Sequence, residues 1–190
     1  MNKILLFLAI PIGIIVVVAL IAVGYYNGFV TQSQNVDNQW AQVETQYQRR
    51  FDLIPNLVNS VKGVLTQEQA VFGQIAEART RYAGAQTVND KVKAANEIES
   101  TLSRLMVIVE NYPQLKSNET VAALMDELGG TENRVAVERQ RFNDMVKAYN
   151  LSVSRIPGKI FASIMGFGPK EYFASVEGAN QAPAVNLDLK

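Results

Sequence analysis

The sequence contains neither cysteine nor histidine. Without cysteine, the chain has no disulfide, no thiolate metal ligand and no thiol nucleophile. Without histidine, it also lacks the commonest general base and the commonest zinc ligand, which excludes serine–histidine and cysteine–histidine catalytic pairs. Carboxylate, lysine, tyrosine or magnesium chemistry is all that is left. The sequence therefore predicts a protein that is not an enzyme, with no catalytic residue, no metal and no cofactor.

The sequence also has no excess of positive or negative charge. The chain has 18 lysines and arginines against 18 aspartates and glutamates. Proteins that bind nucleic acid usually carry a basic field, so we expect no nucleic-acid partner. A length of 190 residues leaves room for one modest domain and an anchor.

A long uncharged run stands near the amino terminus. Residues 4–23 read ILLFLAIPIGIIVVVALIAV, and about 20 apolar residues suffice to cross the hydrocarbon layer of a lipid bilayer. Tyr25 and Tyr26 follow, as is typical of a membrane interface. A cleaved signal peptide would have a shorter apolar region. We expect a retained single-pass membrane anchor, and Lys3 favours a domain outside the cytoplasm.

Apolar residues then return every three or four positions, which is the spacing of one face of a helix. This spacing predicts one long amphipathic, coiled-coil-like helix from Thr31 to Gly84, after a short connector at residues 24–30. Pro55 lacks an amide hydrogen and is expected to kink that helix. The apolar series comprises Val36, Trp40, Val43, Tyr47, Ile54, Leu57, Val61, Leu65, Phe72, Ile75 and Tyr82.

Two further helices are predicted beyond this one. A series over residues 92–112 predicts a helix that ends before Pro113. A series over residues 118–156 predicts a helix capped by Ser117 or Asn118, which the double glycine in its middle either breaks or bends. No strand pattern competes. The fold class is therefore all-α, with an N-terminal transmembrane helix followed by a long antiparallel bundle of three or four helices.

The chain divides into three predicted segments. Residues 1–30 form the membrane anchor and connector, residues 31–160 the helical bundle domain, and residues 161–190 an aromatic and then flexible tail. We expect the tail aromatics to pack over the bundle end, with an exposed docking segment as the alternative, because large exposed apolar patches are uncommon on monomers. These aromatics are Phe161, Phe167, Tyr172 and Phe173.

Several motifs, in order, resemble the LemA family of bacterial membrane proteins. The first is RRFDLIPNLVNSVKG at residues 49–63, and the others are NYPQLKSN at 111–118 and ELGGTENRVAVERQRFND at 127–144. The resemblance covers nearly the whole chain. It implies a helical bundle on a single membrane helix, in a family without an established catalytic activity. Some relatives are encoded beside a membrane-embedded metalloprotease, which suggests an envelope metalloprotease as a partner.

Polar residues gather in two helical stripes that are candidates for network or partner-binding sites. Arg50 differs from them because it lies within the apolar seam, where it is expected to reach Glu138 or Glu132. One interpretation is a buried polar network that fixes helix register; the other is a stripe that binds a partner. The stripes comprise Arg49, Asp52 and Asn56 on the first helix and Glu132, Arg139, Asn143 and Asn150 on the third.

These observations predict a membrane-anchored structural, scaffold or adaptor protein that acts by contact, with self-association of the long helix as one route. The alternative is a receptor-like module that binds a small ligand or peptide at the polar stripe, and a remote third is a carboxylate hydrolase. A pocket that converges on the stripe favours the receptor.

Overall fold

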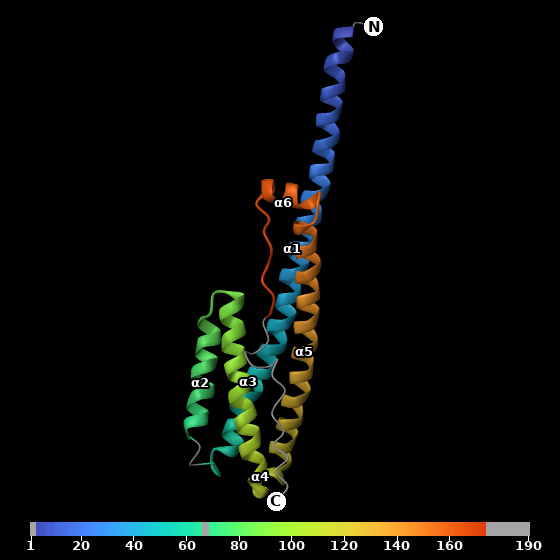
Figure 1. Ribbon diagram of the computed structural model, residues 1–190. Helices are drawn as coiled ribbons and strands as arrows, with labels where there is room; N and C mark the ends of the chain where they lie inside the picture. The colour runs from blue at the N-terminus through green and yellow to red at the C-terminus, as the bar shows by residue number, and fades with distance from the viewer. Residues whose placement is uncertain (1–2, 66–68, 174–190) are drawn as a thin grey trace, which may run out of the picture. The chain divides into compact units, whose positions relative to one another are not determined.

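Figure 1 shows the computed structural model of the chain, which describes residues 3–65 and 69–173. Within these residues the secondary structure is entirely helical, with no strand, so the predicted all-α class is confirmed. The helices are α1 (Lys3–Val61), α2 (Gln69–Gly84), α3 (Val88–Glu110), α4 (Pro113–Lys116), α5 (Glu119–Ser154) and α6 (Gly158–Met165).

α1 departs from the prediction at both of its ends. It runs through residues 24–30, the predicted connector, without a break, and it ends at Val61 instead of continuing to Gly84. Phe29 is buried within the former connector, and its packing offsets the helix cost of the neighbouring glycines, about 1 kcal/mol each. Pro55 stands inside α1 and does not end it.

The end of α1 lies at a turn that contains Gly63. The amide of Val64 donates to the carbonyl of Val61, as in the tight last turn of many helices. Leu65 is buried directly after this turn. The apolar series therefore continues in the sequence, while the helix does not.

α5 begins and continues as its sequence allows. The side chain of Asn118 accepts hydrogen bonds from the amides of Thr120 and Val121 at 3.0 and 3.2 Å, which confirms it as the N-cap. Gly129 and Gly130 lie inside the helix and do not interrupt it. A further helix, α6, begins at Gly158, directly after Pro157. The first residues of the predicted tail, as far as Met165, are therefore helical.

The chain separates into two compact units. Unit 1 comprises Met1–Gln46 and Asn133–Tyr172, and unit 2 comprises Tyr47–Glu132 and Phe173–Lys190. In unit 1, α5 runs antiparallel to α1, since Gln39 donates to Glu138 at 2.6 Å while Phe29 lies beside Gly158. Trp40 packs edge-on against Phe142, with 5.3 Å between the ring centroids. The predicted segment boundaries at residues 30 and 160 remain predictions about domains.

The C-terminal aromatics of unit 1 pack against α1. Phe161 of α6 stacks on Tyr25, with ring centroids 4.9 Å apart and planes 16° apart. Phe167 contacts Tyr26 and Phe29, at 5.8 and 5.4 Å between centroids. These contacts confirm the packed arrangement for both phenylalanines. The predicted flexible part of the tail, residues 180–190, lies outside the described residues.

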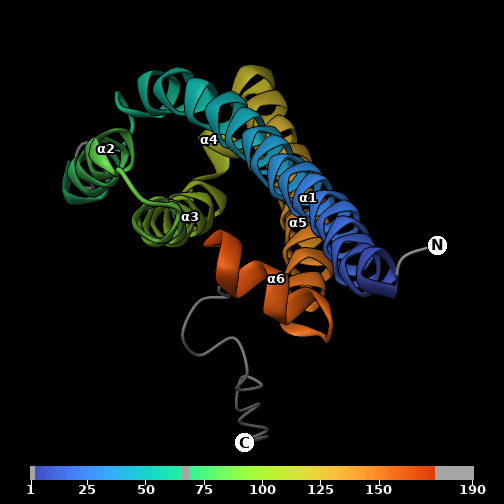
Figure 2. The same ribbon diagram turned by 90° about the horizontal axis from the view of Figure 1, so that it is seen from above.

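In unit 2, α2 and α3 form a hairpin, and Figure 2 shows them side by side. Thr87 caps α3 by accepting a hydrogen bond from the amide of Asp90 at 3.1 Å. Tyr82 of α2 packs edge-on against Phe51 of α1 at 4.8 Å. The buried core of unit 2 includes Tyr47, Ile54, Leu57, Val61, Ile98, Leu102, Leu105, Val109, Val121 and Leu128.

Candidate functional site

Arg50 is the most deeply buried charged residue of those described in unit 2. Its side chain is only 1 % exposed, and its Nη2 lies 3.4 Å from Oε2 of Glu132, one of the two carboxylates expected from the sequence. Nη1 lies 3.8 Å from Oε1 of Glu99 on α3. The guanidinium thus joins α1 to both α3 and α5, and a buried cation needs such partners to offset its desolvation.

The pairing of Arg50 is nevertheless incomplete. Glu132 is 58 % exposed, so water competes for its carboxylate, and no described residue accepts a hydrogen bond from Nε or Nη1 of Arg50. Tyr47 donates to Glu99 across 3.5 Å, a long hydrogen bond. A buried ion pair often adds little net stability compared with apolar side chains of similar volume.

Glu99 is the member of this network that the sequence analysis missed. It lies four residues after Ala95 and three before Leu102, both buried, so it interrupts the apolar seam of α3 as Arg50 interrupts that of α1. A charged residue in an apolar seam was therefore the signal that could have found it.

The other predicted residues of α1 point outward. Arg49, Asp52 and Asn56 are exposed. Arg49 pairs with Glu127 of α5 at 3.2 Å, and Gln48 donates to Asp52 at 2.8 Å. Because both partners of the arginine pair are roughly half-exposed, the pair contributes little to stability. These side chains form a polar row on the surface of unit 2.

The residues of the stripe predicted on α5 fall in two different units and make different contacts. Glu132 belongs to unit 2, where it pairs with Arg50. Arg139 and Asn143 lie half-buried in unit 1. Asn150 holds the segment after α6, because its side-chain amide donates to the carbonyl of Lys170 at 2.8 Å and accepts from its amide at 2.7 Å. Asn150 is therefore a structural clamp of unit 1.

Lys170, which Asn150 holds in place, also contacts α1. Its Nζ lies 2.5 Å from Oδ1 of Asp37, 3.3 Å from the carbonyl oxygen of Ser33 and 5.7 Å from the ring centre of Tyr149. Burial raises the pKa of Tyr149 above its ordinary value of 10.0, and the negative charge of Asp37 raises it further. Helical periodicity could not have predicted the role of Lys170, because this residue lies after the end of α6.

The raised pKa of Tyr149 predicts a loss of stability at alkaline pH. The folded chain binds the phenolic proton more tightly than the unfolded chain, so this contribution is complete below about pH 10 and is lost as the pH rises through the folded-state pKa. We expect Tyr149→Phe to lose less unfolding free energy than the parent as the pH rises above about 10. Chemical unfolding of the detergent-solubilised chain measures this difference; equal losses would contradict it.

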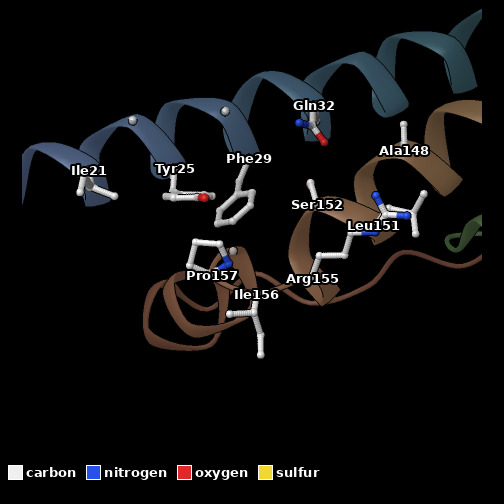
Figure 3. Close-up of a pocket in the computed structure, with 13 residues that line it drawn as sticks. Ile21, Tyr25, Phe29, Gln32, Ala148, Leu151, Ser152, Arg155, Ile156 and Pro157 are labelled. Carbon is white, nitrogen blue, oxygen red and sulfur yellow. The ribbon is translucent and has the colours of Figure 1, made fainter. Parts of the chain in front are cut away.

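A groove lies between α1 and the end of α5 in unit 1, with a volume of about 670 Å³. Figure 3 shows Tyr25, Phe29 and Gln32 of α1 pointing toward Ser152 and Pro157. Glycines on α1 and small side chains on α5 leave this space open, since a Cβ on Gly24 or Gly28 would meet nothing within 4 Å. The lining is mostly apolar, and none of the eight predicted site residues belongs to it.

In the part of the chain that the structure describes, no group of three or more aspartates and glutamates is placed to hold a metal ion. The groove is lined by two groups that titrate, Tyr25 and Arg155, and by no carboxylate. Proton transfer and metal binding both need paired or clustered ligands, and the lining of this groove does not bring such groups together.

α1 also carries a segment that is long and apolar enough to cross a membrane, judged by length and composition. Its side chains from Ile10 to Val23 are largely exposed, as expected of residues that contact lipid. Together with the helical bundle, this segment defines a membrane-associated helical protein.

The chain belongs to the LemA family, whose model matches residues 39–187. Its relatives include Magnetosome protein MamQ 2 of Paramagnetospirillum magneticum, 28 % identical over 206 residues, which cover 94 % of this chain and 75 % of that protein. Magnetosome protein MamQ of Magnetospirillum gryphiswaldense is 28 % identical over 174 residues, which cover 78 % of this chain and 64 % of that protein. Neither the family nor these relatives bear the name of an enzyme.

Proposed function

We propose that this protein is a single-pass membrane scaffold that acts by contact, with its bundle outside the cytoplasm. The observation that carries the proposal is the polar row of Arg49, Asp52 and Asn56, which is exposed on α1 while the opposite edge of the same helix is buried. An exposed helical row of amide and opposite charges is a surface that another helix can recognise.

The anchor strengthens this proposal. A protein held in a membrane meets its partners in two dimensions, which raises their effective concentration and lets modest contacts suffice. The occupant of the row is a second copy of this chain or an envelope membrane protein, such as the metalloprotease that the family resemblance suggests. Lys3 supports the orientation, because positive charge favours the cytoplasmic side.

The receptor alternative requires a pocket at the polar stripe. The groove of unit 1 lies elsewhere and includes neither Arg139, Asn143 nor Asn150. Asn150 is already engaged with Lys170. Contact through the exposed row is therefore favoured over a ligand site at the stripe.

The scaffold proposal predicts that Asp52→Ala combined with Asn56→Ala weakens association about tenfold, the loss expected when central contacts of an interface are removed. Sedimentation of the full chain in mild detergent measures self-association, and co-purification from native membranes measures partner recovery. Both residues are exposed, so the helical circular dichroism should not change.

Lys93→Ala combined with Ser103→Ala is the matched control, because it alters two exposed residues of α3 in the same unit. We expect this control to associate like the parent. Equal association by the Asp52 and Asn56 variant, or metal-dependent hydrolysis by the purified parent, would refute the scaffold.

A further inference from the structure

One face of α6 presents large apolar residues that nothing described covers. Ile160 and Ile164 are 55 % and 77 % exposed, and Ile156, just before the helix, is 80 % exposed. Residues four apart share one face of a helix. The opposite face is packed, because Gly158 and Ala162 are buried. In Figure 3, the side chain of Ile156 points away from α1.

The position of α6 along α1 indicates what surrounds the exposed isoleucine face of α6. Phe161 stacks on Tyr25, which stands two residues beyond Val23, where the apolar segment ends. Two residues advance a helix by about 3 Å. α6 is therefore fixed at the level where α1 leaves the hydrocarbon layer. In Figure 1, α6 crosses α1 instead of running alongside it, which is the direction of a helix that lies in a membrane surface.

The charges around α6 have a single sign. Arg155 and Lys159 are exposed beside the isoleucines, and no acidic residue occurs between Asp144 and Glu171. The surface of a bilayer that contains anionic lipid attracts such basic residues. An exposed apolar face flanked by cations is the pattern of a helix that binds the lipid interface.

We propose that α6 is a second membrane-binding element, which rests on the bilayer surface from which α1 emerges. Ile156, Ile160 and Ile164 enter the boundary between head groups and acyl chains, while Arg155 and Lys159 contact anionic head groups. The occupant is lipid rather than protein, because the isoleucines stand at the end of the apolar segment. The inference rests on α1 crossing the bilayer.

The absence of cysteine makes the test direct, since one introduced cysteine gives one labelled site. The full chain carrying Ile164→Cys, with an environment-sensitive fluorophore, is placed in nanodiscs of phosphatidylcholine and phosphatidylglycerol. Quenching of the label's fluorescence by a lipid that carries a nitroxide near its head group is compared with quenching by a water-soluble collisional quencher. Val137→Cys, on the exposed surface of α5 in the same unit, is the solvent control, and Ile14→Cys is the control for the span.

We expect the lipid-borne nitroxide to quench the label at position 164 about fivefold more strongly than the label at position 137. Aqueous quenching at position 164 equal to that at position 137 would overturn the inference. Protection of position 164 from both quenchers would also overturn it, in favour of a protein partner. If the aqueous quencher reaches position 14 as readily as position 137, the span itself fails. If it reaches position 164 but not position 14, the span stands and the role of α6 fails.

The charge component is tested separately. In the Ile164→Cys chain, replacing phosphatidylcholine in part by phosphatidylglycerol should increase lipid quenching, and Arg155→Gln combined with Lys159→Gln should abolish that increase. An equal increase in the parent and the double variant would show that these cations do not contact the head groups.

Discussion

Arg50→Ala is expected to lower the free energy of unfolding by about 2–4 kcal/mol. Removing one partner of a fully buried ion pair typically costs about 3–5 kcal/mol, because the other charge stays buried. Here Glu132 is 58 % exposed and returns to water, whereas Glu99, at 20 %, does not fully do so. The cavity left by a side chain that is 1 % exposed adds to the loss.

Arg49→Ala is the matched control for this measurement. It removes the neighbouring arginine from a surface pair with Glu127, which should cost at most about 1 kcal/mol. Arg50→Met keeps most of the volume without the charge and should lose less than Arg50→Ala, because a buried ion pair often stabilises no more than apolar packing. Chemical unfolding followed by circular dichroism compares the three. Equal losses for Arg50→Ala and Arg49→Ala would show that Arg50 reaches solvent.

Gly158→Ala is expected to destabilise unit 1 by about 3 kcal/mol. A Cβ at this position would lie well inside contact distance of the backbone carbonyl oxygen of Ser152, and 3.6 Å from Cζ of Phe29. The carbonyl belongs to α5 and cannot move without disturbing that helix. The substitution should therefore push the start of α6 away from α5 and loosen the stacking of Phe161 on Tyr25.

Gly130→Ala provides the opposite result for comparison. This glycine lies inside α5, and its Cβ would meet nothing within 4 Å, so alanine should stabilise the helix by about 0.5–1 kcal/mol. The fluorescence of Trp40, the single tryptophan, reports on unit 1, and circular dichroism reports on total helix. A Gly158→Ala chain as stable as its parent would show that the two backbone segments can separate at little cost.

The helical class and the buried seam were predictable because both follow from periodicity. Val36, Val43 and Leu57 are buried as their three-and-four spacing indicates. Arg50 was recognisable by the same rule, since a charge among apolar neighbours must find a countercharge. Glu99 is also a charged residue among apolar neighbours, in the seam of α3, so the same reasoning could have predicted that it pairs with a countercharge.

Other features could not be reached by periodicity. The apolar series stays in phase through Gly63, so it does not reveal that α1 ends at Val61. α6 has only eight residues, too few for a repeat, and it begins directly after a proline that usually stops a helix. The clamp between Asn150 and Lys170 joins a helix to an irregular segment, where no spacing rule applies.

The continuity of α1 has a mechanical consequence. A change in bilayer thickness tilts a spanning helix, at a cost of fractions of a kcal/mol per ångström of mismatch. A flexible joint would absorb that tilt, but residues 24–30 are helical and Phe29 is buried against its neighbours. When the apolar segment changes its tilt, the rest of unit 1 is therefore expected to tilt with it.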